Sequence, residues 1–247
     1  MRLSLVPLLP LALAAPATIF ERAARPVYWL LAGDSTTASG GGWGDAFLST
    51  TVTTGSSGRN YGHSGATTKS FRAGGDWAKV IKDVGTNKKD YAVYVTIQFG
   101  HNDQKTTSGV TLADYKTNLG NFADEVVAAG GIPILVTPLT RRTFSGGKVV
   151  ENLAEQRQTT IDVATTKNLH YIDLNRASTD YVNAIGQSAA DAYNYASGDR
   201  THLNEKGGVL FSRIVSDLLV EKYSTEVKAA TKPNASLSAM IKAGKPY

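Results

Sequence analysis

The chain has 247 residues, of which 42% are hydrophobic and 19% charged, and this composition excludes a disordered or fibrous protein. It contains no cysteine, which excludes disulfides, thiolate metal sites and a cysteine nucleophile. The net charge of +5 comes without a dense lysine and arginine cluster, so we expect no nucleic-acid partner.

The N-terminal stretch MRLSLVPLLPLALAAP has the organisation of a secretory signal peptide, with one arginine, an apolar centre and small residues at its end. The tripeptide at positions 12–14 fits the small-x-small cleavage rule, which predicts a signal peptide over 1–14 and one domain over 15–247. The apolar segment is too short to span a bilayer. We therefore expect a secreted, extracellular protein without a membrane partner. The alternative is a cytosolic protein with an exposed apolar N-terminus.

Apolar, β-branched and aromatic residues gather in five runs along the chain, which we predict to be strands. These runs are 26–33, 59–65, 91–100, 132–138 and 169–174. The first, third and fourth are almost continuously apolar, as is typical of strands that are covered on both faces of a parallel sheet.

Helical periodicity predicts helices between and after these runs, over 111–129, 150–167 and 204–223. Asn204 is in the position of an N-cap for the last of them. Strands that alternate with helices predict an α/β fold with a doubly wound parallel sheet.

The C-terminal segment, about 224–247, is weakly patterned, and we predict a surface tail with at most a short helix. It contains the N-x-S sequence at Asn234, which is a glycosylation candidate.

Polar blocks follow the predicted strands, where an open parallel sheet collects its active site. The first strand runs into Ser35 in the sequence GDST, the second into Gly65, and the third into Asn102 in GHND. The block DRTH, which contains Asp199 and His202, precedes the last helix. The topology therefore predicts that these blocks meet in one crevice.

These residue types suit acyl transfer by a catalytic group of Ser35, His202 and Asp199. Serine is a poor nucleophile at neutral pH and needs a base, and histidine is the usual one. A carboxylate three residues earlier can orient that base. The backbone N–H groups of Ser35 and Gly65 and the amide of Asn102 could stabilise the oxyanion.

Asp34 and the other three histidines are expected to have structural or substrate-binding roles. Asp34 is expected to brace its own loop through backbone N–H groups. His101 is the rival base, and we expect it in the substrate cleft, as a tentative substrate-binding residue, or directly behind that cleft. His63 and His170 lie within predicted strands and are expected to be structural. The sequence shows no metal-binding pattern, and we expect no cofactor.

The blocks GDST, Gly65 within HSGATTKS, GHND and DRTH, in this order over 28–210, resemble the four sequence blocks of the SGNH hydrolases, or GDSL esterases. Within that superfamily the stretches YWLLAGDST, GWGD, FGHND and THLNEKG are similar to the rhamnogalacturonan acetylesterases. The resemblance implies a three-layer α/β/α sandwich with a five-stranded, parallel, flavodoxin-like sheet. It also implies a shallow cleft and removal of acetyl groups from the pectin backbone.

We therefore expect a secreted carbohydrate esterase that acts as a monomer on an acetylated polysaccharide of pectin. One alternative is the same chemistry on acetylated xylan or on short acyl esters generally. Another is a catalytically silent carbohydrate-binding protein of the same fold. No long apolar lid segment is evident, which counts against a lipase.

Overall fold

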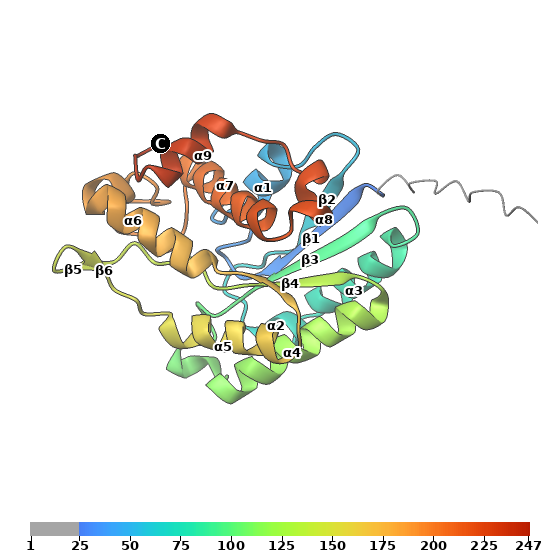
Figure 1. The fold of residues 1–247 in the computed structure, drawn as a ribbon. Coiled ribbons are helices and arrows are strands. Elements are labelled where there is room, and N and C mark those ends of the chain that lie inside the picture. Colours follow the sequence, from blue (N-terminus) through green and yellow to red (C-terminus); the bar gives the residue numbers. More distant parts are fainter. Residues whose placement is uncertain (1–24) are drawn as a thin grey trace, which may run out of the picture.

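A computed structural model describes residues 25–247, and its centre is a five-stranded parallel sheet (Figure 1). The strands are β1 (Val27–Gly33), β2 (Ser57–Asn60), β3 (Ala92–Gln98), β4 (Ile132–Val136) and β7 (His170–Ile172). Their order across the sheet is β2-β1-β3-β4-β7, and every neighbouring pair is parallel. The predicted doubly wound parallel sheet is thus confirmed, whereas the predicted signal peptide lies outside the described residues.

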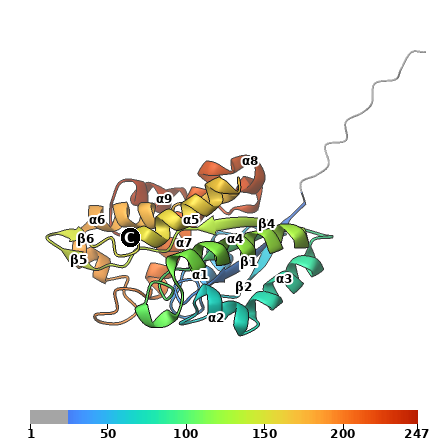
Figure 2. The ribbon, with the colours of Figure 1, turned by 90° about the horizontal axis from the view of Figure 1, so that it is seen from below.

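Helices cover both faces of the sheet, which gives the predicted three-layer α/β/α sandwich (Figures 1 and 2). One layer contains α1 (Gly44–Thr50), α6 (Leu174–Asp191), α7 (Glu205–Lys222), α8 (Ser224–Val227) and α9 (Ala235–Lys242). The other contains α2 (Thr68–Ala73), α3 (Asp76–Asn87), α4 (Leu112–Ala129) and α5 (Ala154–Thr166). The short strands β5 (Phe144–Ser145) and β6 (Lys148–Val149) pair with each other, and Thr106–Ser108 and Lys228–Ala230 form 3₁₀ turns.

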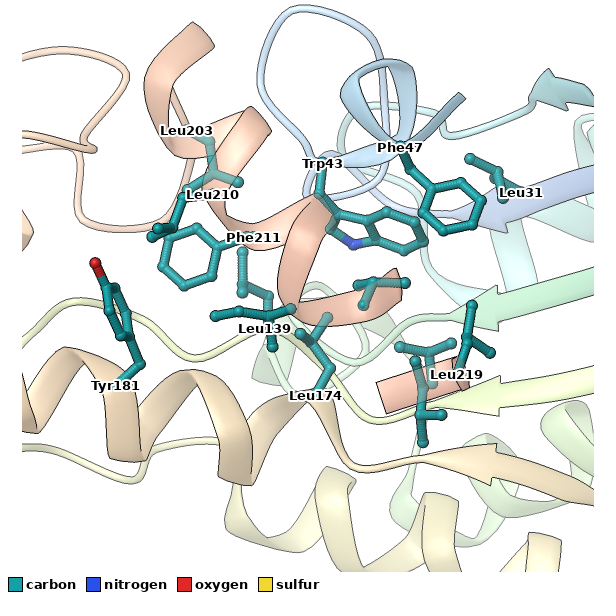
Figure 3. Packing of buried hydrophobic residues seen from close by; sticks show 14 of the residues in the cluster. Leu31, Trp43, Phe47, Leu139, Leu174, Tyr181, Leu203, Leu210, Phe211 and Leu219 are labelled. Carbon is teal, nitrogen blue, oxygen red and sulfur yellow. The ribbon is translucent and has the colours of Figure 1, made fainter. Parts of the chain in front are cut away.

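Burial on both faces explains why the first strand is apolar throughout. Trp29 and Leu31 point into a core cluster shared with α1 and α7, and Leu30 and Ala32 point into the cluster on the opposite face. Full burial of such a side chain is worth about 1.5–3 kcal/mol. Figure 3 shows the first cluster, where Trp43 and other large side chains fill the space under the strand ends.

Side-chain caps fix the beginnings of two of the predicted helices, α4 and α7. Thr111 and Asp114 form a capping box at the start of α4, and Gly130 ends that helix with a φ of 93°. The Asn204 side chain accepts a hydrogen bond from the Gly207 N–H, as the N-cap prediction requires. The prediction for α5 starts four residues early, since α5 begins at Ala154.

Two predicted segments differ from the structure. The second strand ends at Asn60 rather than at position 65, although the His63 N–H still donates to the Gly33 carbonyl at 3.0 Å. His63 is therefore outside the strand, and its exposed ring lies 2.6 Å from the Asp76 carboxylate. The C-terminal segment is also more than a surface tail, because Val227 and Leu237 are buried in the core cluster beside α7.

Of the helices in residues 25–247, none combines the length and the apolar character that crossing a bilayer requires.

Candidate active site

The candidate site lies where the winding of the sheet reverses, between the carboxyl ends of β1 and β3. Ser35 follows β1, Asn102 follows β3, and Gly65 lies on the segment after β2. His202 reaches the same place from the loop that precedes α7. The structure thus brings together the blocks that the sequence placed up to 167 positions apart.

The loop that carries Ser35 is braced from below. A Cβ atom at Gly33 would overlap the Thr37 side chain and the Gln98 carbonyl, so glycine is what lets both approach the backbone this closely. The buried Asp34 carboxylate accepts hydrogen bonds from the Thr36 N–H at 2.9 Å and from the Thr36 hydroxyl at 2.8 Å. This is the loop-bracing role predicted for Asp34, and it fixes the backbone on which Ser35 stands.

Ser35, His202 and Asp199 form a continuous hydrogen-bonded chain. His202 Nε2 lies 2.8 Å from Ser35 Oγ, and His202 Nδ1 lies 2.8 Å from Asp199 Oδ2. Because a carboxylate only accepts hydrogen bonds, Nδ1 carries the ring proton and Nε2 is left to accept the serine proton. This is the geometry that base-assisted attack by a serine hydroxyl needs.

Three hydrogen-bond donors surround the position above Ser35. The N–H groups of Ser35 and Gly65 have no acceptor among the described residues. Gly65 has a φ of 80°, and a side chain there would project into open space over the cleft. The Asn102 amide donates one hydrogen to the Ala66 carbonyl at 3.0 Å, which leaves its second hydrogen for a ligand.

These groups line a cleft of about 620 Å³, whose other walls are small residues together with Lys105 and Tyr195. Ser39, Ser64 and two glycines contribute to it, and Lys105 brings a positive charge whose Nζ lies 2.7 Å from Asn102 Oδ1. In residues 25–247, histidine, aspartate and glutamate side chains form no group that could hold a metal ion.

Comparison with known proteins assigns the family. The model of the GDSL-like Lipase/Acylhydrolase family matches residues 31–208, which include every block described above. The chain belongs to this family.

Individual relatives of this GDSL-like chain point to acetylesterases. It is 29% identical over 217 residues to the rhamnogalacturonan acetylesterase RhgT of Bacillus subtilis (strain 168), a match that covers 80% of this chain and 91% of RhgT. Axe2, an acetylxylan esterase from Geobacillus stearothermophilus, superposes with a TM-score of 0.58 at 20% identity, over 81% of this chain and 94% of Axe2. The Bacillus subtilis protein YXIM superposes with a TM-score of 0.69 at 24% identity over 82% of this chain. This chain spans only 58% of YXIM. These structures confirm the predicted SGNH hydrolase fold.

Asp199 remains a carboxylate in this GDSL-like site at any pH near neutrality. Burial opposes its ionisation, but hydrogen bonds from the His202 N–H, the His202 ring and the Thr201 N–H outweigh burial and lower the pKa of Asp199 below its usual value. A permanent carboxylate keeps the proton of the imidazole on Nδ1.

Two arginines that the sequence analysis missed hold the loop of Asp199 and His202 against the end of β4. The guanidinium of the fully buried Arg142 donates to the His202 carbonyl at 2.6 Å, and the Arg142 N–H donates to the Arg200 carbonyl at 2.8 Å. Burial lowers the pKa of Arg142 to about 10, so it stays charged at neutral pH. The Arg141 guanidinium donates a hydrogen bond to the Thr201 hydroxyl. The sequence could have indicated both arginines, because TRRT (140–143) follows the predicted strand 132–138, as the other polar blocks follow theirs.

His101 lies behind the cleft, not in it. Its ring is buried, with Nε2 2.9 Å from the Leu139 carbonyl and Nδ1 3.3 Å from Asp34 Oδ2. It does not line the cleft, so its position disfavours the tentative substrate-binding role. Burial opposes ionisation of Asp34, but attraction to His101 and the Thr36 hydrogen bonds lower its pKa.

We therefore expect His101→Ala to cost stability rather than substrate affinity. The substitution removes the ring beside the buried Asp34 carboxylate and leaves it only its Thr36 hydrogen bonds, which should lower the free energy of unfolding at pH 7 by about 3–5 kcal/mol. The paired carboxylate stabilises the fold above its unfolded pKa, and this contribution fades as pH falls through the depressed folded pKa. Urea denaturation at pH 7 and at pH 3–4, about the usual range of an aspartate pKa, measures the difference. A fully stable variant that has lost the acid limb of its rate profile would instead make His101 the base.

We expect Asn102→Ala to lower kcat by about 10²–10³-fold with little change in KM, because the amide would act on charge that develops only in the transition state. Asn102→Asp should be worse, since it sets a negative charge against the developing one. Steady-state kinetics with nitrophenyl acetate measure both variants. A raised KM with unchanged kcat would make Asn102 a binding residue.

Proposed function

We propose that this chain is a secreted serine esterase that removes acetyl groups from the rhamnogalacturonan of pectin through an acyl-enzyme. The observation that carries the proposal is the 2.8 Å contact between Ser35 Oγ and His202 Nε2, beside donors without acceptors.

In the proposed reaction, Ser35 Oγ attacks the acetyl carbonyl carbon while His202 Nε2 takes the serine proton. The N–H groups of Ser35 and Gly65 and the Asn102 amide stabilise the oxyanion. The ester C–O bond then breaks, and the sugar oxygen leaves with the proton from His202. Water, activated by the same nitrogen, attacks the acetyl-serine, and acetate and free Ser35 result.

The walls of the cleft favour an acetylated polysaccharide over a lipid. Serine and glycine residues form much of its lining, with Tyr195 as the one aromatic residue. The serines offer hydrogen bonds to sugar hydroxyls, and the lining residues form no apolar channel for an acyl chain. Among polysaccharides, an anionic one suits the Lys105 amine at the site and the net charge of +5. The likeness to RhgT supports rhamnogalacturonan, which carries uronate carboxylates. The likeness to Axe2 keeps acetylated xylan as the alternative.

Secretion fits a substrate that lies outside the cell, and it rests on the predicted signal peptide over 1–14. The Asn234 side chain caps α9 by accepting from the Leu237 N–H, and the residue is exposed, so glycosylation there stays a prediction. The monomeric state is likewise part of the proposal.

The test is acetate release from acetylated rhamnogalacturonan oligosaccharides, acetylxylan oligosaccharides, and nitrophenyl esters of two to twelve carbons. The proposal expects the highest kcat/KM on the rhamnogalacturonan fragments and a steep fall with acyl length. Faster release from xylan would favour the alternative substrate. Binding of these oligosaccharides without any acetate release would favour a silent carbohydrate-binding protein.

A further inference from the structure

A second hollow of about 480 Å³ adjoins the catalytic cleft, between α1 and the beginning of α7. The two hollows share Gly40, Gly41 and Tyr195 as lining residues. Two of these three residues have no side chain, so Tyr195 is the one large side chain that borders both hollows. We call the two adjoining hollows together the groove. The proposed reaction at Ser35 makes no use of this extension.

The backbone of Tyr195 is anchored by hydrogen bonds, while its side chain is exposed. Its N–H donates to the His202 carbonyl at 3.0 Å, and its neighbour Asn194 forms an antiparallel bridge with Leu203. Tyr195 is nevertheless 59% exposed, more than any other large hydrophobic residue in 25–247. An exposed aromatic ring at the edge of a groove offers an apolar face on which the ring of a sugar can pack.

The charges divide the groove into two ends. Lys105 lines the catalytic cleft, whereas the exposed residues Asp45 and Glu205 line the second hollow. Two carboxylates repel a uronate but accept hydrogen bonds from the hydroxyls of a neutral sugar. Ala46, Leu203 and Val209 add apolar surface to the same hollow.

We propose that the second hollow is a binding subsite for an uncharged sugar next to the acetylated residue, with Tyr195 as its stacking platform. This inference rests on the proposed function for the identity of the polymer. A neutral sugar at Tyr195 and a uronate toward Lys105 would set the direction in which the chain lies across Ser35.

The kinetic test compares Tyr195→Ala and Tyr195→Trp on acetylated oligosaccharides of increasing length. Tyr195→Ala should lower kcat/KM by about 10-fold or more on fragments long enough to reach the subsite. It should lower kcat/KM on nitrophenyl acetate much less, because that ester carries no sugar ring to stack on Tyr195. Tyr195→Trp keeps an aromatic face and should retain most of the long-fragment activity. Tyr247→Ala, a partly exposed tyrosine outside both hollows, is the matched control and should change neither.

An equal loss on nitrophenyl acetate would make Tyr195 a support of the His202 loop and overturn the subsite. So would acetate release that is unaffected by Tyr195→Ala at every fragment length, although the proposed function would then stand. Calorimetry of deacetylated oligosaccharides with Ser35→Ala and Ser35→Ala/Tyr195→Ala measures the subsite without turnover. Weaker binding by the double variant is expected even if the esterase proposal fails, and equal binding contradicts the subsite.

Discussion

We expect Ser35→Ala to lower kcat by about 10³-fold or more on every ester substrate, because the acyl-enzyme can no longer form. The remaining rate would come from the oxyanion donors and from binding alone. Folding should be retained, since the Ser35 hydroxyl makes its hydrogen bond to His202 and not to the core. Acetate release and thermal unfolding, measured on the same preparation, check both parts.

Ser39→Ala and Ser64→Ala are the matched controls, because both serines line the same cleft without a histidine partner among the described residues. On nitrophenyl acetate, which has no sugar hydroxyls to bind, each should keep activity within about twofold of wild type. A serine-directed phosphonate should label Ser35 alone. Labelling at Ser39 or Ser64, or near-normal turnover by Ser35→Ala, would contradict the assignment of the nucleophile.

The second large effect is expected at Asp199. Asp199→Asn should lower kcat by about 10⁴-fold, because an amide in this place can hold the wrong tautomer of His202. A pH–rate profile of kcat/KM on nitrophenyl acetate measures this loss and shows whether it holds across the pH range.

Stability gives an independent readout of the same carboxylate. The depressed pKa of Asp199 means that ionised Asp199 stabilises the fold above its unfolded pKa. That contribution is lost as pH falls through the lower, folded pKa, so wild type and Asp199→Asn should converge in stability on acidification. Asp180→Asn, which breaks the exposed pair with Arg176 on α6, is the control and should leave the rate profile unchanged. If Asp199→Asn kept the wild-type rate at every pH, Asp199 would have no catalytic role, and the DRTH block would only lead into helix α7.

The sequence by itself determined the class of fold and the residues of the proposed catalytic chain. Periodicity is local, so the alternation of apolar runs and amphipathic stretches was enough to predict the parallel sheet and helices such as α4 and α7. In such a sheet the carboxyl ends of the strands meet, which placed Ser35, Gly65 and Asn102 on one edge. Helices α2, α3 and α6 were not predicted: α2 is short, and α6 is interrupted by Gly186, whose φ is 78°.

Only the tertiary structure decided what the buried polar residues do. His101 neighbours Asn102 in sequence, yet its ring turns away from the cleft to Asp34 and Leu139, which belong to the ends of other strands. Arg142 holds the His202 loop from 60 positions away, and the His202 carbonyl also accepts the Tyr195 N–H at the edge of the cleft. A buried charge needs a partner, but which partner it finds depends on strand order and loop path, and local sequence patterns do not encode either.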